Sequence, residues 1–313
     1  MVEIFSLVFI ILGLVLFEII TSIDNAVINA DVLTTMSQRA RRWFLTWGIL
    51  SSVFVVRFVL PWAIVWAAIP SLGPIGALTA TFSSDPKVIE ALEMSAPPLL
   101  MTGGVFLVFL FLHWVFLEPK NYGLRGERHI EKHGVWFFAV VSILLALIVW
   151  FAINKNPIMA FGAVVGSTAF FIVHGFKENA AKHEQELMGK AGMSDWSKIL
   201  YLEVIDATFS IDGVIGAFAF TLAVPLILIG NGVGAIAVRQ ITISNIERVK
   251  RYKYLKNGAM YSIFILGWVM VANAFGVHIP EWLSPIATFA IIGWFFWKSK
   301  RELSKAGLKV GKV

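Results

Sequence analysis

The sequence contains no cysteine, which excludes disulfide frameworks, thiolate metal sites and covalent haem attachment. Any metal ion that this chain binds must therefore be held by oxygen or nitrogen atoms. Charged residues are also scarce, at 15% of 313 residues, whereas hydrophobic residues reach 58%. This composition excludes a soluble domain and a disordered chain. It predicts an all-α, polytopic membrane helix bundle whose apolar surface faces the lipid bilayer.

Sequence motifs typical of enzymes are absent as well. There is no GxSxG nucleophile elbow, no phosphate-binding GxxxxGK(S/T) loop and no HExxH zinc motif. The glycine-rich GNGVGA at Gly230 lies in an apolar stretch and is typical of close helix packing. We therefore expect no enzymatic activity. The formal net charge of +6 does not indicate a nucleic-acid partner, because the basic residues fall in short loops between apolar runs.

Nine stretches approach or exceed the roughly 20 mostly apolar residues that a membrane-spanning helix needs. They are 3–30, 43–69, 99–117, 134–154, 157–176, 199–222, 223–243, 257–280 and 282–297. Lysine and arginine gather in every second connection, namely in 31–42, 118–133, 177–198, 244–256 and 298–313. The other connections hold only Lys87 and Lys155. The positive-inside rule then places the N-terminus outside and the C-terminus in the cytoplasm.

The chain contains an internal repeat built on two Ser-Ile-Asp motifs, SIDNAVINA and SIDGVIGA. In each copy an acid precedes the motif, and a glycine and an arginine follow at equal spacing in the next apolar stretch. The matching residues are Glu18, Ser22, Asp24, Gly48 and Arg57 in the first copy and Asp206, Ser210, Asp212, Gly230 and Arg239 in the second. Because the expected topology makes the copies antiparallel, this pattern predicts an inverted repeat.

The repeat sets the expected domain plan, which is one transmembrane domain over residues 1–313. Repeat A covers about 1–117 and repeat B about 199–280, with linking spans at 134–176 and an extra C-terminal span at 282–297. In transporters made of inverted repeats, the ion or substrate site lies near the bilayer midplane, between the two copies. The acidic motifs are therefore the natural place to look for a site.

Polar residues in both copies recur at helical spacing and form stripes that should face the bundle interior. The first stripe is Glu18, Thr21, Ser22, Asn25 and Asn29, and the second is Glu203, Asp206 and Ser210. Asp24 and Asp212 each lie six residues after an acid of the stripe, about 240° around a regular helix. They can join it only where the helix opens. We therefore predict helix breaks at Asp24-Asn25 and at Asp212-Gly213.

The charge balance of these motifs implies that a cation binds or that some of the carboxylates stay protonated. One charge at the bilayer centre costs about 3 kcal/mol on insertion scales, and the two arginines cannot neutralise all the acids. Arg57 and Arg239 are either fixed structural partners or counter-ions that occupy the acids when a metal has left. A cation would be held by these five carboxylates, with Asn, Ser and Thr oxygens nearby: Glu18, Asp24, Glu203, Asp206 and Asp212. Whether His113, His174 or Asn231 contributes is left open. Interfacial packing or ordinary hydrogen bonding explains the two histidines, and interhelical hydrogen bonding explains Asn231.

With these residues in view, the chain resembles the TerC family of bacterial integral membrane proteins. The resemblance rests on EIITSIDNAV at Glu18 and EVIDATFSIDGVIGAF at Glu203, and covers nearly the whole chain. The overall pattern is similar to a branch of that family, within the wider LysE-like transporter group, whose function is uncharacterised. Gly213 stands where many relatives have serine, which removes one hydroxyl ligand.

The resemblance implies a multi-pass protein of the bacterial cytoplasmic membrane that exports Mn²⁺ or a related divalent cation, with Ca²⁺ as an alternative. By matching position, it implies that the metal site is lined by Glu18, Asp24, Asn25, Glu203, Asp206 and Asp212. We expect protons as the coupling ion, because carboxylates left in a low dielectric take up protons once a metal departs. A homo-oligomer is left open. Two alternatives remain. One is a non-transporting membrane protein that binds metal and supports the metallation or stability of exported proteins, and the other is a transporter of an anion or small metabolite that uses Arg57 and Arg239 as ligands.

Overall fold

The computed structural model describes residues 2–48, 55–80, 83, 85–189, 194–244 and 249–305, and these contain helices but no strand. The helices are α1 Val2–Thr21, α2 Ile23–Thr34, α3 Gln38–Trp43, α5 Leu60–Ala68, α6 Gly73–Thr79, α7 Pro86–Leu117, α8 Glu127–Lys132, α9 Phe137–Ile153, α10 Pro157–Gly189, α11 Asp195–Ala217, α12 Val224–Ser244, α14 Leu255–Ala274 and α15 Leu283–Lys305. Two π-helical segments, η1 Phe44–Gly48 and η2 Val55–Val59, and two 3₁₀ turns, η3 Pro70–Leu72 and η5 Gly134–Trp136, complete the set.

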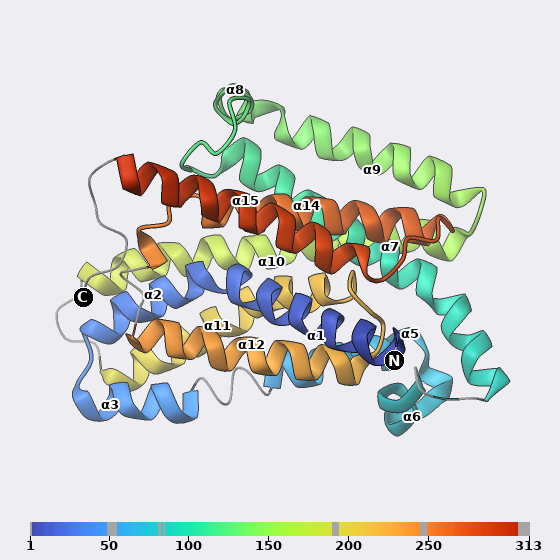
Figure 1. Ribbon diagram of the computed structural model, residues 1–313, viewed down its shortest axis with the longest axis horizontal. Helices are drawn as coiled ribbons and strands as arrows, with labels where there is room; N and C mark the ends of the chain where they lie inside the picture. Colours follow the sequence, from blue (N-terminus) through green and yellow to red (C-terminus); the bar gives the residue numbers. More distant parts are fainter. Residues whose placement is uncertain are drawn as a thin grey trace.

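The long helices run roughly along the longest axis of the molecule (Figure 1). Helix α7 packs against α10 and α14, and α1 packs against α12 and α15. Helix α11 contacts α1, α2, α7, α10 and α12, so other helices surround it on several sides. The acidic motif of the second repeat therefore lies in the interior of the bundle.

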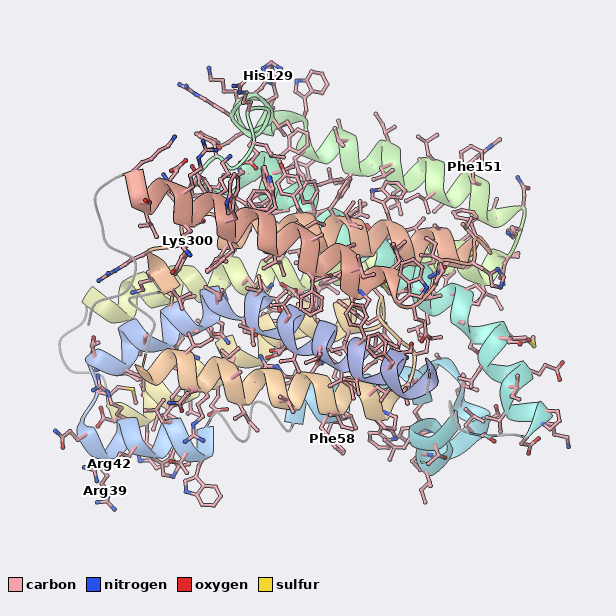
Figure 2. All side chains as sticks on the ribbon, in the orientation of Figure 1. Arg39, Arg42, Phe58, His129, Phe151 and Lys300 are labelled. Carbon is pink, nitrogen blue, oxygen red and sulfur yellow. The ribbon has the colours of Figure 1, made fainter. Side chains whose placement is uncertain are left out.

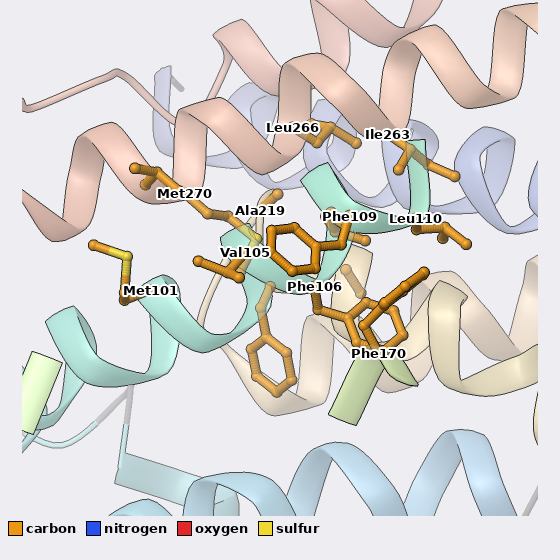
Figure 3. Close-up of a cluster of buried hydrophobic side chains, with 14 of the residues drawn as sticks. Met101, Val105, Phe106, Phe109, Leu110, Phe170, Ala219, Ile263, Leu266 and Met270 are labelled. Carbon is orange, nitrogen blue, oxygen red and sulfur yellow. The ribbon is translucent and has the colours of Figure 1, made fainter. Parts of the chain in front are cut away.

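The hydrophobic core is centred on α7. Its buried residues Val105, Phe106 and Phe109 meet Phe170 of α10 and Met270 of α14 (Figure 3). The Phe106 and Phe109 rings both contact the Phe170 ring in edge-to-face geometry, at centroid distances of 6.1 and 5.9 Å. Such aromatic pairs fix the relative position of the helices that carry them. The core therefore holds α7 and α10 in one register.

The number of spans differs from the nine predicted. Within the described residues, five helices are long and apolar enough to cross a membrane, and the number rises to seven if each of two bent pairs counts as one span. The five are Pro86–Leu117, Gly134–Ile153, Pro157–Asn179, Val224–Thr242 and Leu255–Ala274. The bent pairs are Phe5–Thr21 with Asn25–Thr34, at 52°, and Val56–Ala68 with Pro70–Thr79, at 105°. The chain is thus an all-helical polytopic membrane protein with five to seven candidate spans.

The predicted sixth and ninth spans form helices that fail the same test. Helix α11 carries five charged residues, and α15 ends in the polar, mostly charged sequence KSKRELSK. Neighbouring helices surround α11, so its charges are compensated by protein groups rather than exposed to lipid. The two helices are therefore less apolar than the five candidate spans, and for α11 the polar residues lie on a helix that other helices enclose.

The two predicted helix breaks have different outcomes. Helix α11 runs without interruption from Asp195 to Ala217, so the predicted break at Asp212-Gly213 is wrong. In the first copy the chain bends at Ser22, two residues before the predicted position. The backbone hydrogen bonds of Ser22 to Glu18 and of Ala26 to Ser22 persist, at 3.1 and 2.9 Å. The first break is therefore a bend rather than an unwound segment.

Basic side chains gather at one end of the bundle. Arg39 and Arg42 on α3 and Lys300 on α15 lie at the left end in Figure 2. The start of α1 and helix α6 lie at the opposite end (Figure 1). The charge asymmetry seen in the sequence therefore corresponds to two ends of the folded molecule.

Candidate functional site

Glu18 lies in the apolar helix α1 and is fully buried. Its Oε1 atom forms an ion pair with Nη2 of Arg57, at 2.6 Å, and accepts a hydrogen bond from Oγ of Ser22, at 2.7 Å. Nη2 of Arg57 also donates to Oγ of Ser22, at 3.1 Å. Arg57 belongs to the π-helical segment η2, a rare backbone form that is frequent at functional sites. The first repeat thus holds a buried carboxylate and guanidinium in direct contact.

Asp206 of α11 faces α2. Its Oδ1 atom accepts hydrogen bonds from Nδ2 of Asn25 and from Nδ2 of Asn29, the latter at 3.1 Å. Asn25, Asn29 and Asp206 are all buried. Because Asn25 and Asn29 are four residues apart, they share one face of α2. The interior position of both predicted polar stripes is therefore confirmed for these residues.

Several buried oxygen atoms in this region have no hydrogen-bond donor in the described part of the chain. They are Oε2 of Glu18, Oδ1 of Asn25 and Oδ1 of Asn29. Burying a polar acceptor without a partner costs free energy, so such atoms indicate a ligand or a strained site. Carboxylate and amide oxygens are ligands that hard divalent cations prefer. This group, together with Asp206, is defined here as the acidic-amide site.

Glycines of the second repeat allow α1 to approach α11 and α12 closely. A Cβ atom at Gly213 would lie 2.9 Å from Oε2 of Glu18, and one at Gly234 would lie 2.6 Å from Cβ of Glu18. Gly216 and Gly230 meet Phe17 and Leu14 in the same way. The Asp-Gly sequence, which the chain has in place of Asp-Ser, therefore makes room for the Glu18 carboxylate. Gly213 therefore has a steric role, in addition to removing one possible hydroxyl ligand.

Asp212 lies apart from the acidic-amide site. Its Oδ2 atom forms an ion pair with Nζ of Lys177 on α10. Its neighbour Gly213 faces Glu18, so the unbroken helix turns Asp212 toward a different neighbour. The sequence pattern does not predict Lys177 as the partner of Asp212. A lysine just after a strongly apolar stretch is nevertheless a signal that such a residue pairs with a buried acid.

The remaining predicted site residues are placed as follows. Oε1 of Glu203 lies close to Gly48 at the end of η1. Nε of Arg239 on α12 is buried without a hydrogen-bond partner among the described residues. Asn231 is fully buried, and neither polar atom of its side chain has a partner in that same part of the chain. The side chain of Asp24 lies outside the described set, so its predicted role stays a prediction.

Comparison with known proteins identifies the family of the chain. A family model described as "Protein of unknown function (DUF475)" matches residues 23–305. The uncharacterized membrane protein YceF of Bacillus subtilis (strain 168) is 28% identical over 99 residues, which cover 31% of this chain and 38% of that relative. No solved structure matches the chain. The chain therefore belongs to the DUF475 family of proteins of unknown function, as a multi-pass, all-helical membrane protein.

Proposed function

We propose that this protein is a secondary transporter that exports a divalent metal cation, with Mn²⁺ as the favoured substrate, across the bacterial cytoplasmic membrane. The observation that carries the proposal is the acidic-amide site. Buried oxygens of Glu18, Asn25 and Asn29 lack donors among the described residues, and Asn25 and Asn29 both donate to the Asp206 carboxylate. In a packed interior, several unsatisfied acceptors cost free energy without any benefit, whereas a cation-binding site requires such acceptors as ligands.

The donor set favours a hard cation. All the candidate ligand atoms at the acidic-amide site are carboxylate or amide oxygens, which suit Mn²⁺, Ca²⁺ and Mg²⁺ better than softer metals. The resemblance to the TerC family favours Mn²⁺ among these, with Ca²⁺ as the alternative. Asp24 is the further acid that we expect to join the site, as a neighbour of Asn25 in sequence.

Arg57 supplies a mechanism for emptying the site. The guanidinium holds Oε1 of Glu18 at 2.6 Å, so a cation that binds Glu18 must displace it or share the carboxylate with it. Arg57 then returns as counter-ion when the metal leaves. This exchange gives Arg57 the second of the two roles expected from the sequence.

Proton coupling follows from the chemistry of the ligands. Carboxylates bind metal in their deprotonated form, so metal binding releases protons and metal release favours their uptake. In a low dielectric, an ionised carboxylate without a counter-charge is costly. We therefore propose that protons enter as Mn²⁺ leaves.

The test is Mn²⁺ flux in proteoliposomes with Asp206→Asn, which removes the charge and keeps the shape. We expect flux to fall roughly tenfold or more, the size seen when metal-site groups are lost. Asp195→Asn is the matched control, because Asp195 lies at the exposed start of the same helix. A hydrogen bond from Ser37 lowers the pKa of Asp195, so this control also removes an ionised carboxylate. Flux should be unchanged in the control.

Equal Mn²⁺ flux in Asp206→Asn and in the parent would contradict the proposal. A parent that binds Mn²⁺ but moves none across the bilayer would instead favour the alternative, a non-transporting protein that supports the metallation of exported proteins. A pH-sensitive dye inside the same vesicles tests the coupling, since export with proton exchange must change the internal pH with the opposite sign to metal movement.

A further inference from the structure

A second group of metal-ligating side chains lies on α7 and α10, outside the acidic-amide site. His113 of α7 and His174 of α10 have ring centroids 3.7 Å apart, and Nε2 of His174 lies 3.3 Å from Oε1 of Glu178. One ligand atom from each of the three residues lies within 4.8 Å of the other two. His113 is buried, His174 is half-buried and Glu178 is exposed, so the group is reached from one side.

The positions of the two imidazoles are fixed by close packing of their helices. Gly162 and Gly166 form a GxxxG pair on α10, and a Cβ atom at Gly162 would lie 2.6 Å from the carbonyl oxygen of Pro98 on α7. Gly166 meets the carbonyl oxygen of Thr102 in the same way. Small residues at this spacing let helix backbones approach closely. The contact sets the register that brings His113 and His174 together.

Aromatic rings pack against both imidazoles, and a carboxylate lies beside one of them. The Phe170 ring stacks on the His174 ring, with centroids 5.7 Å apart and planes 6° from parallel, and Phe137 meets His113 edge-on at 5.5 Å. Nδ1 of His113 lies 3.5 Å from Oε1 of Glu118. Metal-ligating histidines commonly direct their second ring nitrogen to a carboxylate, which leaves the other nitrogen for the metal. Glu118 is placed for this role.

The basic residues near the group are each matched by an acid. Nζ of Lys256 lies 2.9 Å from Oε2 of Glu118, and Lys177 forms an ion pair with Asp212. The charge of each lysine is therefore partly neutralised by a carboxylate, which weakens its repulsion of a cation bound at the imidazoles. A cation can approach Glu178 from the exposed side without meeting an uncompensated positive charge.

We propose that His113, His174 and Glu178 form a binding site for a borderline transition-metal ion such as Zn²⁺ or Co²⁺, separate from the acidic-amide site. Two imidazole nitrogens and one carboxylate oxygen are a common donor set for Zn²⁺, with a fourth position taken by water. Imidazole suits Zn²⁺, Ni²⁺ and Fe²⁺, whereas Ca²⁺ and Mg²⁺ prefer sites made of oxygen alone. The site therefore differs in metal preference from the proposed transport site, and it does not rest on the proposed function.

The test is metal binding to the full chain, purified without a polyhistidine tag, reconstituted in nanodiscs and stripped with a chelator. Co²⁺ titration followed by visible absorption should show the bands of a site with nitrogen ligands, and Zn²⁺ should displace the Co²⁺. The double variant His113→Gln/His174→Gln should lower Co²⁺ affinity roughly tenfold or more. Ca²⁺ added in excess should leave the spectrum unchanged.

Two controls separate this site from the other histidines and from the transport site. His278→Gln removes an exposed histidine beyond the end of α14 and should leave Co²⁺ binding as in the parent. Asp206→Asn should also keep the Co²⁺ spectrum, even where it abolishes Mn²⁺ flux. Loss of flux with an intact Co²⁺ spectrum distinguishes the two sites.

A substitution at the exposed ligand Glu178 separates an effect on metal binding from an effect on folding. The Glu178 side chain is 61% exposed, so Glu178→Gln should not disturb packing, and it should still weaken Co²⁺ binding and shift its spectrum. The proposal is overturned if the parent shows no Co²⁺ bands. It is equally overturned if Glu178→Gln and the double histidine variant bind Co²⁺ with the parent's affinity and spectrum.

Discussion

At the scale of single residues, the stability of the first repeat depends on the buried ion pair between Glu18 and Arg57. Both side chains are almost inaccessible, with 1% and 7% of their surface exposed. In such surroundings the removal of one partner leaves an uncompensated charge, which is more damaging than the removal of both. Each charge therefore constrains the other, and the pair responds to mutation as a unit.

Arg57→Met should lower the free energy of unfolding by about 3 kcal/mol, because the Glu18 carboxylate loses its counter-charge. The double variant Arg57→Met/Glu18→Gln should recover most of that loss, since it buries no unpaired charge. Chemical denaturation of both variants in detergent micelles measures the difference. A single variant that is as stable as the parent would show that Glu18 is protonated or compensated by another group.

The polar stripe at Glu18, Ser22, Asn25 and Asn29 was predictable from helical spacing, because periodicity alone decides which residues share a face. The partner of Asp212 was not. On a regular helix Asp212 points away from Glu203 and Asp206. It could join their polar stripe only if the helix were broken at Asp212-Gly213, which is why a break is predicted there. The structure keeps α11 intact and pairs Asp212 with Lys177, from a helix that packs beside it.

At the scale of elements, close glycine contacts fix the helices that carry charge. The contact of α7 with α10 rests on Gly162 and Gly166, and the contact of α1 with α11 and α12 rests on Gly213 and Gly234. Packing of small residues drives helix association in lipid, where apolar side chains gain little by leaving their solvent. The glycine positions therefore determine the register between helices, and with it which polar groups meet.

Two glycines of α10 should respond oppositely to alanine. Gly166→Ala places a Cβ against the backbone carbonyl of Thr102, which cannot yield easily, and should destabilise the protein by about 1–3 kcal/mol. Gly175 faces open space, so Gly175→Ala should be neutral or stabilise by about 0.5–1 kcal/mol through helix propensity. Thermal unfolding in one detergent compares the two. Equal effects would mean that the α7–α10 contact is looser than described.

At the scale of the whole molecule, the basic end sets the expected orientation in the membrane. Arg39, Arg42 and Lys300 lie together at that end, and the helices leading there come from both halves of the chain (Figure 2). The positive-inside rule assigns such an end to the cytoplasm. The start of α1 and the end of α15 lie at opposite ends of the bundle, as the predicted topology requires (Figure 1).

The lack of native cysteine makes the orientation directly measurable. Single variants Arg39→Cys and Lys300→Cys should react with a membrane-impermeant maleimide only after the cells are permeabilised, whereas Lys87→Cys should react in intact cells. All three residues are exposed, so reactivity reports side rather than burial. The cysteine-free parent gives the background. The reverse labelling pattern would place the N-terminus in the cytoplasm.

The sequence by itself determined the membrane class, the helical content, the buried polar stripes and the basic end, because composition and periodicity are local properties that each helix expresses alone. Only the tertiary structure decided which charges meet and how many helices qualify as spans. Glu18 with Arg57, Asp206 with Asn25 and Asn29, Asp212 with Lys177 and His113 with His174 are contacts between separate helices. Such contacts depend on the register and rotation of packed helices, which small residues and core aromatics fix only after the bundle has formed.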